Sequence, residues 1–179
     1  MQSDEEIRAR QAIEQLKYRY WRACDAKDPG GFRACFVATG GVLDFGPLGR
    51  TDPDTMVDVF RRIALATAAD GGPRILDMHH GFMPSITIEG SGPGGPPRRA
   101  TGSWTLQFRQ VDRDNGTETV STGEYADVYV VESGRWVMSE CLFTPGWSVT
   151  RTLDNATVTY PEAHTVPGAA AAATAGADS

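Results

Sequence analysis

The hydrophobic period of the chain changes near Arg74, and this change limits the folds that the chain can adopt. Before Arg74, apolar residues recur at steps of three and four, as on one face of a helix. After it, apolar and polar residues alternate, as on strands that bury one face. Helices followed by successive strands predict an α+β domain. The expected form is a cone-shaped α+β barrel in which three N-terminal helices pack on a strongly curved, mainly antiparallel sheet.

Three helices are expected in the first part of the chain. A long helix over 4–25 carries acidic side chains in its first turn, where they interact favourably with the helix dipole. A short helix runs through 32–36, and a third covers about 53–69 before an Asp-Gly-Gly-Pro turn. A short strand is expected over 40–45. Side chains that can cap the three helices precede them at Ser3, Asp28 and Asp52.

A meander of strands is expected in the second part. Apolar and polar residues alternate over 104–109, and on the next strand Tyr125, Asp127 and Tyr129 share one face while Ala126, Val128 and Val130 share the other. Gly-containing turns separate such segments. Residues 90–97 are rich in Gly and Pro, which predicts a hairpin loop. The segment 161–179 contains an Ala-rich run without large apolar residues, which is typical of a flexible tail. We therefore expect one domain, over 1–160.

The composition excludes several classes of partner. The chain of 179 residues has a net charge of -6 and scattered arginines, so it lacks the basic surface typical of nucleic-acid binding. No apolar stretch is long enough to cross a bilayer, and the acidic N-terminal residues do not resemble a secretory signal. The cysteines at 24, 35 and 141 provide neither a disulfide framework nor zinc-type spacing. A cytoplasmic protein without a nucleic-acid or membrane partner is expected.

An acidic residue follows the apolar stripe of the first helix. Ile13, Leu16 and Tyr20 recur at helical spacing, and the stripe continues toward Cys24. Asp25 is thereby placed at the edge of the core, where a carboxylate must be paired or hydrogen-bonded. Histidine is the partner that most readily turns such a pair into acid–base chemistry. The central hypothesis is that Asp25 and His79, the first histidine of the later His-His pair, meet inside a pocket.

The two adjacent histidines, His79 and His80, point to opposite faces if they lie on a strand, so one of them faces inward. His79 is the expected catalytic residue and His80 the alternative. Adjacent histidines do not supply zinc-ligand spacing, so no metal is expected. Two structural alternatives remain open at this stage: Asp25 can cap a helix end together with Asp28, and His79 can be held by a single hydrogen bond.

Several aromatic residues are spaced as core or pocket-lining residues rather than as catalytic groups. The expected substrate-binding wall consists of Tyr18, Trp104, Tyr125 and Phe143. The cysteines have no activating partner that the sequence identifies, so none is assigned to catalysis.

Over about residues 7–147, the chain resembles the SnoaL-like branch of the nuclear transport factor two-like superfamily. The order of helices and strands supports this resemblance, and so do local signatures that are weak alone. They are Ile-Glu-Gln-Leu at 13–16, Cys-Asp-Ala-Lys-Asp at 24–28, Phe-Arg-Ala-Cys-Phe at 32–36, His-His-Gly at 79–81 and Gly-Arg-Trp-Val at 134–137. Within the superfamily, the acid and histidine are similar to those of scytalone dehydratase, bile acid dehydratase and hexachlorocyclohexane dehydrochlorinase.

This resemblance implies a lyase of the dehydratase type that needs no cofactor. By position, Asp25 matches the acid of these enzymes, His79 their histidine and Tyr20 a hydrogen-bonding tyrosine, whereas His80 fits less well. The implied substrate is a small hydrophobic, polycyclic or steroid-like alcohol or ketone. The alternatives are ketosteroid-isomerase-like or polyketide-cyclase activity, or a non-catalytic module for ligand binding or dimerisation. A homo-oligomer, dimer or trimer, is expected to form through the outer sheet face, which includes Val128 and Val130.

Overall fold

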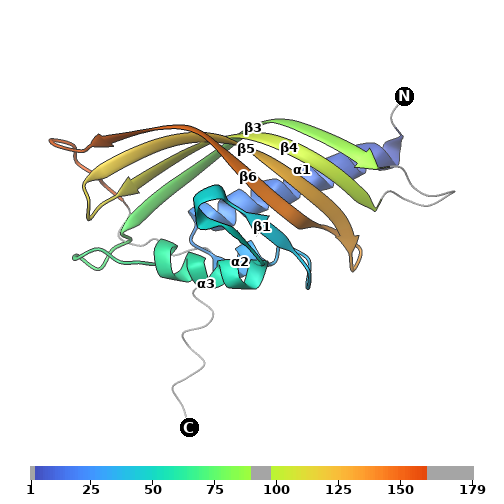
Figure 1. Cartoon of the computed structure of the whole chain (residues 1–179), viewed down its shortest axis with the longest axis horizontal. Helices are drawn as coiled ribbons and strands as arrows, with labels where there is room; N and C mark the ends of the chain where they lie inside the picture. The colour runs from blue at the N-terminus through green and yellow to red at the C-terminus, as the bar shows by residue number, and fades with distance from the viewer. Residues whose placement is uncertain (1–2, 90–97, 161–179) are drawn as a thin grey trace, which may run out of the picture.

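The computed structural model describes residues 3–89 and 98–160 of the chain (Figure 1). The hairpin loop expected at 90–97 and the tail expected at 161–179 lie outside these residues. A single domain over 1–160 therefore stays a prediction. None of the helices in the described ranges is long and apolar enough to cross a membrane.

The helices begin where the caps place them. Helix α1 covers Asp4–Asp25, and Ser3 and Glu6 form a reciprocal capping box at its start. Helix α2 covers Pro29–Arg33, and its N-cap Asp28 accepts a hydrogen bond from Gly31 N. Helix α3 covers Pro53–Ala64 and begins at Asp52, whose carboxylate accepts from Asp54 N and Thr55 N. A short 3-10 helix, η1, spans Gly46–Leu48.

Two helices end earlier than predicted, because backbone contacts with other segments replace the helical bonds. Helix α3 ends at Ala64 rather than near 69. Beyond it, Ala68 N donates to Gly72 O and Arg74 N donates to Ala66 O, which turns the chain back on itself. Helix α2 ends before Phe36, which instead forms a parallel bridge with Met138 of the sheet.

Six strands form one curled, unclosed sheet in the order β2-β1-β6-β5-β4-β3. The short strands are β1 (Val42–Asp44, within the 40–45 predicted) and β2 (Arg50–Thr51). The long strands are β3 (Ile75–Glu89), β4 (Arg99–Asp112), β5 (Thr117–Glu132) and β6 (Arg135–Thr152). Strand β1 runs parallel to β6, and the other neighbours are antiparallel. The predicted fold class is confirmed: the long strands arch over α1, with α2 and α3 on the same side (Figure 1).

The core lies between α1 and the concave face of the sheet. Ile13 and Leu16 of α1 are buried there together with Trp104, whose indole N–H donates to the Tyr129 hydroxyl at 2.9 Å.

Val128 and Val130, the residues expected on the outer sheet face, are half-buried and alternate along β5 with fully buried residues. Self-association through the outer face stays a prediction.

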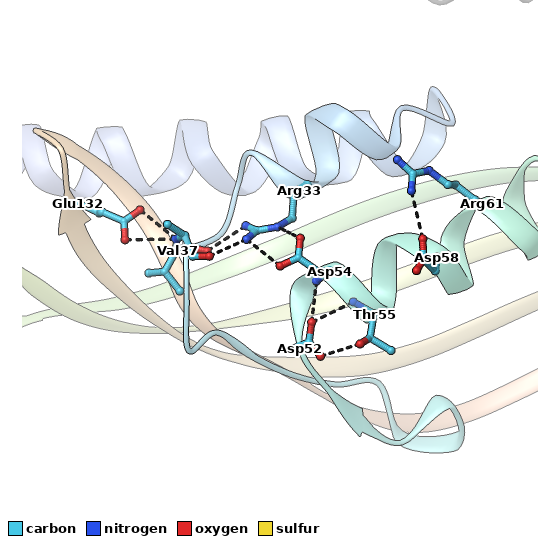
Figure 2. A network of polar contacts seen from close by, with 9 residues as sticks. Arg33, Val37, Asp52, Asp54, Thr55, Asp58, Arg61 and Glu132 are labelled. Carbon is cyan, nitrogen blue, oxygen red and sulfur yellow. Dashed lines mark hydrogen bonds and ion pairs between the residues drawn. The ribbon is translucent and has the colours of Figure 1, made fainter.

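Arg33 holds α3 in place (Figure 2). Its guanidinium contacts both carboxylate oxygens of Asp54 in α3, at 2.6 and 3.2 Å. It also donates to the carbonyl oxygens of Val37 and Ala38, both at 2.9 Å. The Glu132 carboxylate accepts from Ala38 N on the other side of this loop. One arginine therefore joins α2, the following loop and α3.

Replacing Arg33 by Ala is expected to lower the free energy of unfolding by about 1–2 kcal/mol, because four hydrogen bonds with partly exposed partners are lost together. Urea unfolding followed by circular dichroism measures this change. The matched control is Arg61→Ala, which removes an exposed pair with Asp58 within α3 (Figure 2) and should cost at most a few tenths of a kcal/mol. Equal losses in the two variants would contradict the anchoring role of Arg33.

Candidate active site

Asp25 and His79 are in direct contact. Asp25 is the last residue of α1, and His79 lies on β3, the edge strand of the sheet. The Asp25 carboxylate accepts from the backbone N–H of His79 with both oxygens at 3.1 Å. His79 Nδ1 lies 2.5 Å from Asp25 Oδ1. The Asp25 side chain is 29% exposed and that of His79 is 13% exposed, so the pair is largely shielded from water.

The contact fixes the tautomer of the imidazole. A carboxylate can only accept a hydrogen bond, so Nδ1 carries the imidazole proton and donates a hydrogen bond to Asp25. The neutral ring then has its lone pair on Nε2, which can accept a proton from another molecule. The same carboxylate also accepts a hydrogen bond from the backbone N–H of His79. Asp25 therefore holds both the backbone and the ring of this residue.

A cavity of about 450 Å³ adjoins His79, between α3 and the concave face of the sheet. Most of its wall is apolar. The wall includes Met56, Val59, Phe60 and Ile63 of α3, and Leu106, Phe108, Tyr125 and Phe143 of the sheet. Gly123 allows part of this wall to form, since a Cβ atom there would lie 2.3 Å from the Phe143 ring. The cavity can take an apolar molecule of moderate size.

The expected site residues are placed in two groups. Tyr20, His79, Tyr125 and Phe143 line the cavity, whereas Asp25 lies behind His79 and is not part of the wall. Tyr18 and Trp104 also lie outside the wall. Their rings pack edge-on at 6.2 Å, and Trp104 is only 1% exposed within the core.

His80 lies on the opposite face of β3 from His79 and is exposed, as strand alternation predicts. Its ring stacks on that of Phe82. The structure thus brings the first histidine of the pair, and not the second, to Asp25 and the cavity.

Burial keeps the hydroxyl and thiol groups of the wall neutral. It raises the pKa of Tyr20 well above its ordinary value, and the nearby Tyr125 raises this pKa further. Burial raises the pKa of Tyr125 and that of the Cys24 thiol in the same way. Tyr20 can therefore donate a hydrogen bond in the cavity but cannot act as a phenolate at neutral pH. Among the described residues, no cluster of His, Cys, Asp and Glu could hold a metal ion.

The cavity wall also includes a carboxylate, Asp77, that was not expected from the sequence. It forms an ion pair with Lys27 and accepts from Gln110 Nε2 at 3.0 Å. Strand periodicity could have identified it, because Asp77 lies two residues before His79 and so shares its face. Nothing in the sequence pattern pairs it with Lys27.

Comparisons with known proteins agree with this architecture. A family model described as a SnoaL-like domain matches residues 5–141. A scytalone-dehydratase-like protein from Novosphingobium aromaticivorans is 17% identical over 83% of this chain and 91% of its own, with a TM-score of 0.67. A hexachlorocyclohexane dehydrochlorinase, LinA type 3 from Novosphingobium barchaimii, is 13% identical over 88% of this chain and 100% of its own, with a TM-score of 0.68.

At these identities the solved structures show a shared fold alone. No curated protein sequence matches the chain. The family model covers more than half of the chain, from within α1 to within β6. The chain therefore belongs to the SnoaL-like domain family.

Proposed function

We propose that this protein is a cofactor-independent lyase of the dehydratase type. The observation that carries the proposal is the contact between Asp25 and His79 beside a cavity with a mainly apolar wall. A structural histidine would need only one hydrogen bond. Here the acid holds both the ring and the backbone, and the ring adjoins a space for a ligand. The proposed substrate is a small hydrophobic alcohol with a carbonyl group, on a polycyclic or steroid-like skeleton.

The proposed reaction removes water across a carbon–carbon bond. Nε2 of His79 takes the proton from the carbon next to the carbonyl group, and the electron pair of that C–H bond forms the new double bond. The C–O bond of the alcohol breaks, and its oxygen leaves with a proton supplied by the imidazolium or by solvent. The products are an unsaturated ketone and water, so neither an oxidant nor a reductant is required. Asp25 stabilises the imidazolium between the two proton transfers.

Tyr20 is proposed to donate a hydrogen bond to the carbonyl oxygen or to the leaving hydroxyl group. Its raised pKa keeps the donor protonated while negative charge develops on the substrate. Positioned acid–base groups contribute on the order of 10²–10⁴-fold to rate, so the apolar wall must supply much of the rest by excluding water.

The solved relatives support the reaction class. Dehydratase and dehydrochlorinase are both names of eliminations, in which a proton and a leaving group are lost from neighbouring carbons. The two relatives differ in leaving group, so their names support proton abstraction by the shared fold more strongly than any single substrate.

A panel of fused-ring β-hydroxy ketones tests the proposal, because loss of water yields a conjugated ketone that absorbs in the ultraviolet. We expect turnover of at least one member, and its loss by 10²-fold or more in His79→Gln. A β,γ-unsaturated ketone belongs in the same panel. If that compound alone reacts, by a shift of its double bond, the protein is an isomerase. Turnover that His79→Gln leaves unchanged would overturn the assignment.

A further inference from the structure

The backbone at the end of α1 is strained at Lys27. Lys27 N donates to Cys24 O and Asp28 N donates to Ala23 O, the paired bonds of a Schellman motif. The left-handed position of this motif favours glycine, yet Lys27 occupies it with φ +58°. A residue with a Cβ atom in this conformation carries a free-energy cost that glycine does not. Because glycine would avoid that cost, the lysine side chain itself needs an explanation.

The side chain of Lys27 reaches the candidate active site. Its ammonium pairs with Asp77, and the two side chains are only 10% and 11% exposed. Gln110, opposite Asp77 on β4, donates to the other carboxylate oxygen. Asp77 lines the cavity with His79, two residues along the same face of β3. Two residues of extended strand span about 7 Å, so the Asp77 charge lies close to the imidazole.

Few groups near His79 are charged at neutral pH. Among residues 3–89 and 98–160, the titratable groups that adjoin it or line the cavity with it are Tyr20 and Cys24 of α1, Asp25 at the end of α1, Asp77 of β3 and Tyr125 of β5. The tyrosines and the cysteine stay neutral, because burial raises the pKa of each. Lys17, behind Tyr125, is paired with Asp127. In the part of the chain that the structure describes, the remaining charges near the imidazole are therefore those of Asp25, Asp77 and Lys27.

We propose that Lys27 is a positioning residue of this site, which neutralises Asp77 so that His79 faces one uncompensated carboxylate, Asp25, instead of two. A second negative charge would stabilise the imidazolium and move the titration of His79 to higher pH. The imidazole would then already hold a proton at the pH where it has to take one from the substrate. The pair also ties the chain just after Asp25 to the strand that carries His79. The catalytic meaning of this role rests on the proposed function, whereas the electrostatic role does not.

A double-mutant cycle of Lys27 and Asp77, here called the charge cycle, tests the inference without a substrate. The pH titration of the His79 imidazole, followed by NMR, is measured in each variant. Lys27→Met and Lys27→Gly should each raise the titration midpoint by about one pH unit, the effect of one carboxylate near 7 Å in a partly screened site. Asp77→Asn alone should lower it, because the ammonium is left unpaired. The double variant Lys27→Met/Asp77→Asn should return the midpoint to within a few tenths of a unit of the original.

Lys27→Gly separates this role from a structural one. Glycine relieves the left-handed strain, so the fold should be kept even though the ion pair is lost. The matched control, Arg22→Met, removes an exposed positive charge from the last turn of the same helix and should shift the midpoint by less than about 0.3 units, because water and salt screen that charge. The NMR signal of His79 is identified as the histidine signal that is missing from the spectrum of His79→Gln.

The inference is overturned if the lysine variants leave the midpoint unchanged, or if Arg22→Met shifts it equally. Failure of the proposed function would give a different result. No compound of the panel would then undergo elimination or isomerisation, whereas the variants of the charge cycle would still shift the His79 midpoint as stated. Where turnover is found, its pH–rate profile should shift in the same direction as the titration in each variant.

Discussion

Asp25→Asn is expected to keep the protein folded and to lower turnover by about 10²–10⁴-fold. The asparagine amide can still accept from the His79 backbone, but it carries no charge to stabilise the imidazolium. If its NH₂ group turns toward Nδ1, the imidazole proton is displaced to Nε2, the atom that has to act as the base. Steady-state kinetics on any substrate from the panel measures the loss. The loss should appear mainly in kcat, because Asp25 is not part of the cavity wall.

The matched control for Asp25→Asn is Asp28→Asn, three residues further along. Asp28 accepts a backbone hydrogen bond as the cap of α2, and among the described residues it forms no hydrogen bond or ion pair with His79. Asparagine is an equally good cap, so both turnover and stability should change little. The titration midpoint of His79 should fall in Asp25→Asn, since a negative charge is removed. If it does not move, Asp25 holds the edge strand and has no part in the chemistry.

The largest effect on stability is expected from Lys17→Met, at about 3–5 kcal/mol. Lys17 and Asp127 are fully buried, and their charged atoms lie 2.7 Å apart between α1 and β5. Asp127 Oδ2 also accepts from the Tyr129 hydroxyl at 2.7 Å, whereas Oδ1 has no hydrogen-bond partner among the described residues. Removing the ammonium would leave a buried carboxylate without a counter-charge. The ammonium also lies 3.6 Å from the centroid of the Tyr125 ring, a contact that would be lost as well.

Urea unfolding measures this loss, and a second variant keeps the prediction testable if Lys17→Met does not fold. In Lys17→Met/Asp127→Leu, apolar side chains replace both charges, so most of the lost stability should return. A loss below about 1 kcal/mol in the single variant would contradict the account. So would a double variant that is less stable than the single one.

Much of the helical part could be predicted because its signals are local. The caps Ser3, Asp28 and Asp52 determine where α1, α2 and α3 begin, and each acts within three residues. The end of α3 could not be predicted in the same way. Residues 65–69 continue a helical composition, but their backbone pairs with 72–74, and such pairing leaves no periodic signal in the sequence.

The site was predictable only in part, for a related reason. Strand alternation separates His79 from His80, but no spacing within one element shows that Asp25 meets a residue 54 positions away. That pairing was predicted from the need of a carboxylate at the core edge for a partner, and the resemblance matches the same two residues by position. Alternation also shows that an aromatic side chain is buried without showing whether it lines a cavity. Trp104 and Tyr125 both face inward on neighbouring strands, yet only Tyr125 of these two is part of the wall.

In the proposed mechanism, His79, held by Asp25, takes a proton from carbon inside the cavity. Hydrogen–deuterium exchange measures this step directly, in deuterated water with a fused-ring ketone such as tetralone, which has no leaving group and so cannot complete an elimination. The protein is expected to speed exchange at the carbon next to the carbonyl. His79→Gln should abolish the acceleration, Asp25→Asn should reduce it, and His80→Gln should leave it unchanged. Equal acceleration by the unaltered protein and by His79→Gln would contradict the account.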